Sequence, residues 1–302
     1  MSETRKGFAA AVAAFVVWGL IPLYFKPLRE VSAFQVVAQR ALWSWLFVLG
    51  CMALRGELGE IRTPLADRRV AARIALAAIL VSINWLVYVW AVAHNHVIDA
   101  SLGYFINPLV NILLGVALLS ERLNRAQWTA VALAAAGVAY LAFVTGNLPW
   151  ISLTLGFSFA CYGFIRKVVR VEALPGLAIE TSMLMPFAIA YLLWCQARGS
   201  GALGHSGPAI DALLIGSGPL TALTLFLFAY GARRIPYSTM GVLQYICPTL
   251  QLVCGVLAFH EPFAAAQAVG FALIWAALVI YACDGFLRAR AAAAAPLNIA
   301  GT

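Results

Sequence analysis

The strongest constraint on the fold is a succession of apolar runs, each long enough to cross a lipid bilayer. Because the hydrocarbon core offers no hydrogen-bond partners, the backbone N–H and C=O groups of such a run must bond within it, which favours an α-helix. We therefore predict an all-α integral membrane protein with ten transmembrane helices, five in each half of the chain. The runs lie at about residues 7–26, 33–54, 72–93, 100–119, 126–144, 148–165, 177–197, 210–231, 239–259 and 264–285.

Composition argues against a soluble protein. The chain is 63% hydrophobic and 11% charged, whereas soluble domains carry about 25% charged residues. The formal charge is +8, but the Lys and Arg residues are spread over short loops and form no contiguous basic face, so we expect no nucleic-acid partner. The six cysteines show neither metal-ligand spacing nor a disulfide framework.

The distribution of basic residues predicts the orientation. Of the 20 Lys and Arg residues, 16 fall on the side that holds both ends of the chain and the 55–73 segment. Three fall on the opposite side, namely Lys26, Arg29 and Arg198. Since cytoplasmic loops carry the excess of Lys and Arg, we expect the N- and C-termini in the cytoplasm.

The two halves of the chain are related by an internal repeat. A shift of 140 residues aligns Pro108 with Pro248, Gly115 with Gly255, Glu121 with Glu261 and Gln127 with Gln267. Each half has an odd number of runs, so the second half enters the membrane from the opposite side and the repeats are inverted. We predict a first five-helix repeat over 1–145, a second over 146–290, and a disordered cytoplasmic tail over 291–302.

Two polar stripes are candidate parts of a substrate site. Tyr104, Asn107 and Asn111 are spaced i, i+3 and i+7, which places them on one face of the fourth helix. The ninth helix repeats the spacing with Gln244, Cys247 and Gln251. In lipid such a stripe faces either a neighbouring helix, as interhelical hydrogen bonds, or a wet cavity. We include Tyr104, Asn107, Asn111, Gln244 and Gln251 in the predicted substrate site.

A proline lies within each stripe. Proline lacks an N–H group and obstructs the carbonyl four residues earlier, so Pro108 is expected to free the Tyr104 carbonyl, and Pro248 the Gln244 carbonyl. Each proline either shapes helix packing or exposes backbone to substrate or water.

Other polar and aromatic residues extend this predicted wall. Asn84 and Tyr88 lie one turn apart in the third helix, and Tyr245 adjoins the second stripe. Trp18 is either an aromatic wall or a packing residue. The wall carries amides, hydroxyls and rings without a charge, and therefore suits a neutral or zwitterionic, partly aromatic solute.

Arg40 and Glu180 occupy equivalent places in the second and seventh helices with opposite charges. At ~1.5 Å per residue, Arg40 lies about 10 Å below the outer boundary and Glu180 about 5 Å above the inner one, so most of the ~30 Å core separates them. We expect Asp99 or another outer-side acceptor beside Arg40. For Glu180 we expect one of Arg166, Arg170, Arg233 and Arg234. The alternative is that each side chain extends to its nearer interface.

Metal and catalytic chemistry are not indicated. His94 and His96 would diverge on a helix, and no third ligand with zinc-like spacing completes a site with Asp99. We read Glu121 and Glu261 as structural, because each precedes a helix whose N-terminus favours a carboxylate. We expect no cofactor, no metal and no enzyme, and the lack of a P-loop sequence argues against direct use of ATP.

Several motifs resemble a transporter family. Trp18-Gly19, the segment Ser101–Asn111 and Ser120-Glu-Arg-Leu are similar to the EamA branch of the drug/metabolite transporter superfamily, and within it to RarD-type, chloramphenicol-sensitive permeases. The second half adds the motifs Gln244–Gln251, His260-Glu-Pro262 and Ile179-Glu-Thr181. The resemblance implies a ten-span carrier of the bacterial inner membrane that works by alternating access. Its central cavity would be lined mainly by spans 1, 3, 4, 6, 8 and 9.

We therefore expect a secondary transporter, an exporter of small neutral or zwitterionic amphipathic metabolites or drugs. Its partners would be the solute and the lipid bilayer, and the sequence indicates no particular oligomeric state. The alternatives are a non-transporting membrane scaffold or sensor, or an intramembrane lipid-modifying enzyme.

Overall fold

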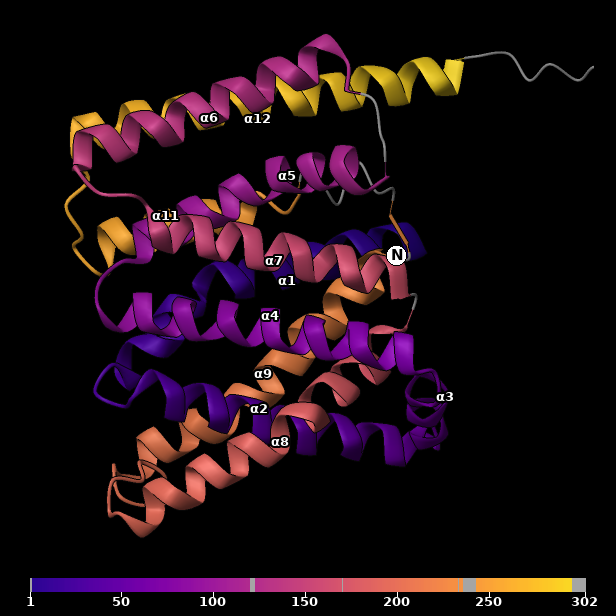
Figure 1. The fold of residues 1–302 in the computed structure, drawn as a ribbon, viewed down its shortest axis with the longest axis vertical. Helices are drawn as coiled ribbons and strands as arrows, with labels where there is room; N and C mark the ends of the chain where they lie inside the picture. Colours follow the sequence, from indigo (N-terminus) through magenta and orange to yellow (C-terminus); the bar gives the residue numbers. More distant parts are fainter. Residues whose placement is uncertain (1, 120–122, 170, 233, 236–242, 295–302) are drawn as a thin grey trace, which may run out of the picture.

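A computed structural model describes residues 2–119, 123–169, 171–232, 234–235 and 243–294, which form a bundle of helices (Figure 1). No strand occurs in these ranges. The long helices are α1 (Glu3–Phe25), α2 (Ala33–Arg55), α4 (Arg68–Ala93), α5 (Val97–Leu119), α6 (Arg125–Thr145), α7 (Trp150–Val169), α8 (Ala173–Ala197), α9 (Pro208–Ala232), α11 (Ile246–Leu257) and α12 (Ala265–Ala294). Three short elements join them, namely η1 (Lys26–Leu28), η2 (Leu58–Ile61) and α3 (Arg62–Ala66).

The predicted all-α membrane fold is confirmed. Within the described ranges, eight helices are long and apolar enough to cross a membrane, and α11 is a shorter apolar helix. The 20-residue helix α7 is not among the eight, since Arg166 and Lys167 near its end lower its hydropathy. The count of ten transmembrane helices stays a prediction.

Local sequence signals set several helix ends. Asp67 caps α4 through its side chain, and Asn124 forms a capping box with Gln127 at the start of α6. Helices α2 and α6 end at Gly56 and Gly146, whose φ angles of 73° and 67° lie in the left-handed region that suits glycine. Helix α12 continues to Ala294, four residues beyond the predicted boundary of the second repeat, and the rest of the predicted tail lies outside the described residues.

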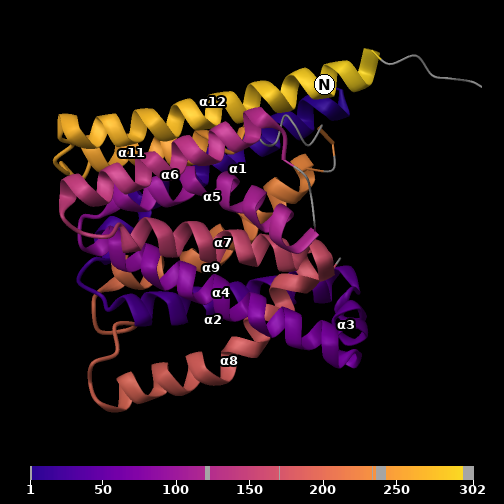
Figure 2. The same ribbon diagram turned by 45° about the horizontal axis from the view of Figure 1, so that its top comes forward.

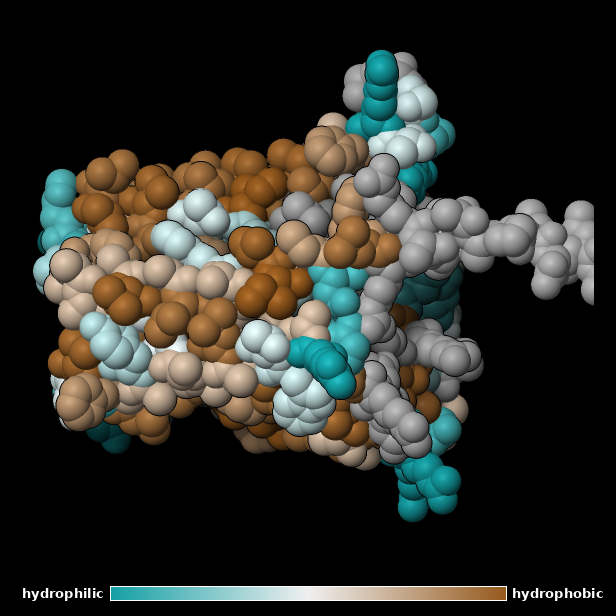
Figure 3. Space-filling view, turned by 90° about the horizontal axis from the view of Figure 1, so that it is seen from above, coloured by the Kyte–Doolittle hydropathy of each residue, from teal (hydrophilic) through white to brown (hydrophobic). Residues whose placement is uncertain are grey.

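The helices run between two ends of the bundle. The N-terminus, α3 and the C-terminal end of α12 lie at the same end in both ribbon views (Figures 1 and 2). Seen from above, the flank between the two ends is largely hydrophobic, with hydrophilic side chains gathered towards the ends (Figure 3). Exposed apolar side chains include Phe143 on α6 and Val279 on α12, as expected of helices that contact lipid.

Each main contact between a helix of one half and helices of the other half has a counterpart under the repeat. Helix α7 packs on α4 and α5, just as α1 packs on α9 and α11. Helices α6 and α12 pack mainly on each other. A helix of the second half thus contacts two helices of the first half, and a helix of the first half contacts two of the second.

Helices α5 and α7 approach closely because glycines face each other. A Cβ atom on Gly103 would lie 2.7 Å from the Ser152 carbonyl oxygen, and one on Gly156 would lie 3.0 Å from the Gly103 carbonyl oxygen. Small residues at such crossings let backbones come together in membranes. This close contact brings the polar face of α5 against α7.

Candidate functional site

Asn84 forms the centre of a polar junction among α4, α5 and α7. Its Nδ2 donates to the Leu155 carbonyl oxygen at 3.1 Å and to Ser158 Oγ at 3.0 Å. The Tyr104 hydroxyl donates to Asn84 Oδ1 at 3.1 Å. Asn84 is buried, so its amide is used for interhelical hydrogen bonds.

Tyr88 lies beside this junction with an unused hydroxyl. Its ring centroid is 5.9 Å from that of Tyr104, and Tyr104 meets Phe159 of α7 edge-on at 5.8 Å. The Tyr88 hydroxyl is buried and has no hydrogen-bond partner in the described part of the chain. Such a group costs free energy until a polar ligand atom or water reaches it.

The first predicted stripe divides between two environments. Asn107 is buried and donates to the Gly156 carbonyl oxygen of α7 at 3.2 Å. Asn111 is exposed and donates to Asn107 Oδ1 at 3.1 Å. Asn107 therefore follows the hydrogen-bonding alternative, whereas Asn111 is accessible to solvent.

The second stripe is only partly helical. Helix α11 begins at Ile246, so Gln244 and Tyr245 lie in the turn that precedes it. The Cys247 N–H bonds to the Gln244 carbonyl at 3.3 Å, and Pro248 falls in the first turn of α11. The expectation that Pro248 frees the Gln244 carbonyl was wrong, because a first-turn proline removes no intrahelical bond. Pro108, by contrast, lies inside α5.

Gln251 joins α11 to α1. Its Nε2 donates to the Trp18 carbonyl oxygen at 3.2 Å and contacts Cys247 Sγ at 3.4 Å. Its Oε1 is buried without a hydrogen-bond partner among the described residues. The amide therefore keeps one free acceptor.

The aromatic candidates separate into two groups. Trp18 and Tyr104 pack against the hydrophobic cluster that contains Tyr88. Tyr245 packs instead against a cluster built from α5, α6 and α12. Trp18, Tyr88 and Tyr104 therefore lie together, whereas Tyr245 belongs to a different cluster.

Glu180 forms an ion pair inside the bundle. Its Oε1 lies 3.5 Å from Arg166 Nε, and its Oε2 accepts the Tyr162 hydroxyl at 3.3 Å. The side chain is 1% exposed, so it does not extend to the interface. Arg166 is one of the four arginines expected beside it, and that prediction is confirmed. Arg170 and Arg233 lie outside the described residues.

Arg40 has a different environment from the expected one. Its Nε donates to Thr221 Oγ1 of α9 at 2.9 Å, and its guanidinium lies 4.2 Å from the Trp85 ring centroid. The prediction of Asp99 as its partner was wrong, because Asp99 lies in the first turn of α5 and pairs with His96 at 3.0 Å. Arg40 is 5% exposed and points into the bundle rather than to an interface. Its guanidinium thus lies beside α4, the helix that also carries the predicted wall residues Asn84 and Tyr88.

Glu261 caps α5 and not α12, the helix that follows it in the sequence and that we expected it to cap. Its two carboxylate oxygens accept the Val97 N–H at 2.5 Å and the Ile98 N–H at 2.8 Å, at the start of α5 rather than α12. Burial raises the pKa of the Glu261 carboxyl, and these two N–H groups oppose that rise. At the same end of the bundle, Lys26 Nζ donates to the Ala258 carbonyl oxygen at 2.6 Å. Glu121, its counterpart in the repeat, lies outside the described residues.

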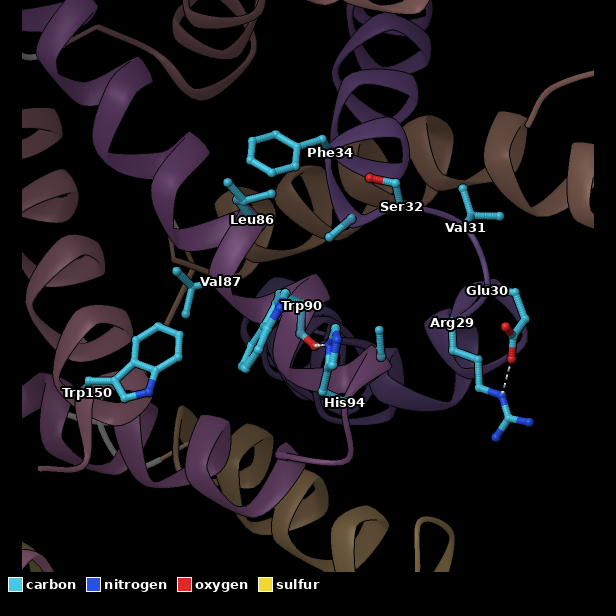
Figure 4. A pocket seen from close by; sticks show the side chains of 12 residues that line it. Arg29, Glu30, Val31, Ser32, Phe34, Leu86, Val87, Trp90, His94 and Trp150 are labelled. Carbon is cyan, nitrogen blue, oxygen red and sulfur yellow. Dashed lines mark hydrogen bonds and ion pairs between the residues drawn. The ribbon is translucent and has the colours of Figure 1, made fainter. Parts of the chain in front are cut away.

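A surface groove of about 500 Å³ lies between the start of α2 and the end of α4 (Figure 4). Trp90 stacks on His94 there, with ring centroids 4.4 Å apart, and Trp150 faces the same groove (Figure 4). None of the predicted substrate-site residues lines it. The groove is a feature of the rim, whereas the unpartnered polar atoms lie inside the bundle. In the described part, no three His, Cys, Asp or Glu side chains form a metal cluster.

Known proteins resemble the chain over nearly its whole length. The profile of the EamA-like transporter family matches residues 5–143. Protein RarD of Streptomyces exfoliatus is 44% identical over 99% of this chain and 96% of its own. The chain belongs to the EamA-like transporter family. "Uncharacterized transporter YojE" of Bacillus subtilis (strain 168) is 43% identical over 93% of this chain and 94% of its own.

These relatives place the chain among the RarD-type members of the EamA-like family, as the sequence motifs indicated. A solved structure described as "Crystal structure of protein" agrees with a TM-score of 0.57 at 18% identity, over 92% of this chain and 96% of that one. At that identity it supports the fold alone. The chain is a multi-pass membrane transporter.

Proposed function

We propose that this EamA-like protein is a secondary transporter that moves small amphipathic metabolites or drugs by alternating access. The observation that carries the proposal is a set of buried polar atoms left without partners inside the bundle, the Tyr88 hydroxyl and Gln251 Oε1. Unsatisfied polar groups in a transmembrane bundle are costly and are expected where a solute or water passes. Aromatic rings from Trp18 and Tyr104 lie beside them and provide apolar contact.

The two inverted repeats, 1–145 and 146–290, would supply the two gates. The matched contacts of α7 with α4 and α5, and of α1 with α9 and α11, support halves that rock about the central residues. At the end opposite the N-terminus, Glu261 and Lys26 join the 258–264 segment to α5 and η1. We propose that this end is closed in the present conformation.

We further propose that the protein exports its solute across the bacterial inner membrane and that both of its termini lie in the cytoplasm. Export rests on the resemblance to drug/metabolite transporters. The cytoplasmic termini rest on the charge bias, since the excess of Lys and Arg lies at their end. We propose no chemical reaction on the solute.

Flux through proteoliposomes tests the function. Purified full-length protein should move members of a panel of neutral, zwitterionic and carboxylate solutes faster than protein-free liposomes do, with and without a proton gradient. Gln251→Leu should lower this flux per correctly inserted molecule, whereas Gln196→Leu at the exposed end of α8 should not. A panel that shows no protein-dependent flux would favour the scaffold or sensor alternative. Chemical conversion of a solute or lipid would favour an enzyme.

A further inference from the structure

Arg40 is a cation buried in a membrane-spanning helix. It lies two turns into α2, and its side chain is 5% exposed. Arginine is rare in transmembrane segments and usually faces a bundle interior, where it pairs with a carboxylate or meets a ligand. The question is therefore which group balances its charge.

The protein balances this charge only in part. Thr221 accepts a hydrogen bond from Nε, and the rings of Trp85 and Phe25 lie 4.2 Å and 5.7 Å from the guanidinium carbon. Among the described residues, no carboxylate forms an ion pair with Arg40, and its two η nitrogens make no hydrogen bond. A hydroxyl and two ring faces offset only part of the cost of burying a full charge.

The neighbouring polar groups are also donors. Trp85, whose ring lies beside the guanidinium, is one turn before Tyr88 on α4, and the Tyr88 ring contacts that of Tyr104. Tyr24 directly precedes Phe25, the second ring beside the guanidinium. Tyr24 donates to the Leu213 carbonyl oxygen and Tyr104 to Asn84, but the Tyr88 hydroxyl has no partner in the described chain. Arg40 and Tyr88 thus offer unused N–H and O–H donors, which an acceptor-only group would satisfy.

We propose that Arg40 and Tyr88 bind the carboxylate of a small amphipathic organic acid, whose apolar part lies against the aromatic rings of the central site. This inference rests on the proposed transport function and narrows its substrate class. A carboxylate supplies one negative charge and four lone pairs, which match one guanidinium and one hydroxyl. A phosphate monoester carries a charge of about −1.5 to −2 at pH 7 and would leave part of it unbalanced here. The Gln251 Oε1 acceptor would suit an N–H or O–H group of the same solute.

Binding to the purified full-length protein tests the proposal with acid and amide pairs of the same shape. The pairs are phenylacetate with phenylacetamide, indole-3-acetate with indole-3-acetamide, and L-phenylalanine with L-phenylalaninamide. The readouts are ligand-induced thermal stabilisation and quenching of tryptophan fluorescence, since Trp85 lies directly beside Arg40. At least one acid should bind roughly tenfold or more tightly than its amide, as expected for charge-assisted hydrogen bonds. Equal binding within every pair, or no binding of any acid, would overturn the proposal.

Variants assign the preference to Arg40. Arg40→Gln should remove the preference for the acid and change amide binding by less than about twofold, while Arg40→Lys should retain part of it. Arg29→Gln, at an exposed position in the loop before α2, is the matched control and should keep the full preference. Tyr88→Phe deletes one hydroxyl and tests the site independently of the folding of Arg40→Gln. An acid preference that survives in both Arg40→Gln and Tyr88→Phe would exclude this site.

The flux assay separates this inference from the proposed function. Flux of neutral solutes without acid selectivity would leave the transporter in place and refute the carboxylate site. A protein that binds acids selectively at Arg40 but moves no solute would refute transport and retain the site.

Discussion

A single buried amide can hold several transmembrane helices in register, and Asn84 does so here. Its three hydrogen bonds join α4 to α5 and α7, and one of them gives the Tyr104 hydroxyl its acceptor. The same bonds fix the orientation of Tyr104, whose ring contacts Tyr88. Asn84 therefore positions Tyr104, and its direct contact with a solute stays a prediction.

Asn84→Leu should destabilise the folded protein by about 2 kcal/mol, if each interhelical hydrogen bond contributes about 0.6 kcal/mol. The measurement is thermal unfolding of the purified protein in detergent. Asn111→Leu is the control, because Asn111 is exposed and makes one bond to Asn107. Equal midpoints for the two variants would show that the Asn84 bonds contribute little.

Sequence reasoning found the partner of Glu180, which follows from depth in the membrane. It did not find the partner of Arg40, which depends on how distant helices pack. Depth along the helix placed Glu180 near the arginines at the end of α7, and it pairs with Arg166. The acceptor of Arg40, Thr221, lies 181 residues away on α9, and no local pattern connects the two. An intramembrane arginine without a facing acidic residue was the signal in the sequence that led to the proposed carboxylate site.

The stability of each helix depends on how it ends and on how it crosses its neighbours. The capping box of α6 and the glycines after α2 and α6 set three helix ends. The start of α11 could not be predicted from the sequence, because the apolar run continues through Gln244 and Tyr245, which form a turn. Hydropathy measures which segments avoid water and does not measure where their helical hydrogen bonds begin.

The cap on α5 should contribute measurably to stability. Glu261→Ala leaves the Val97 and Ile98 N–H groups without their acceptor, so we expect a loss of about 1–2 kcal/mol in the free energy of unfolding. Glu30→Ala at the same end of the bundle is the control, since the Glu30 side chain is 85% exposed. Thermal unfolding of both variants decides the matter, and a loss no larger than that of Glu30→Ala would contradict the prediction.

The crossing of α5 and α7 should tolerate no added side chain. Gly103→Ala puts a Cβ atom 2.7 Å from the Ser152 backbone oxygen, so the helices must separate and the yield of folded protein should fall. Gly163→Ala on α7 meets open space and should be neutral or slightly stabilising, since alanine favours helix over glycine by about 1 kcal/mol. The readout is the monodisperse fraction in size-exclusion chromatography, and comparable fractions would refute the packing argument.

On the scale of the whole molecule, one end carries the N-terminus, α3 and the end of α12 (Figures 1 and 2). The sequence anticipated this arrangement, because even numbers of crossings return the chain to its starting side. The 140-residue repeat relates the helices that make counterpart contacts, although the sequence did not predict those contacts. The sequence could not anticipate the pairing of α6 with α12, because both helices lack the polar patterns that distinguish the central helices.

Cysteine labelling tests which side this end faces. A cysteine placed at Arg68, in a chain whose six native cysteines have been replaced, should not react with a membrane-impermeant maleimide in intact cells and should react after permeabilisation. A cysteine placed at exposed Arg198, at the opposite end, should react in intact cells. Ready labelling at position 68 in intact cells would invert the predicted topology.

The pairing of α6 with α12 also bears on how the protein is made. Helix α6 ends at Thr145, and its principal contact, α12, starts 120 residues later at Ala265. During synthesis at about 5–20 residues per second, α6 therefore waits several seconds or longer in the bilayer before its partner exists. Helix α1 waits longer still for α9 and α11. The nascent first half would hold unpaired helices in the membrane through most of translation, which gives insertion factors that shelter such helices a defined interval in which to act.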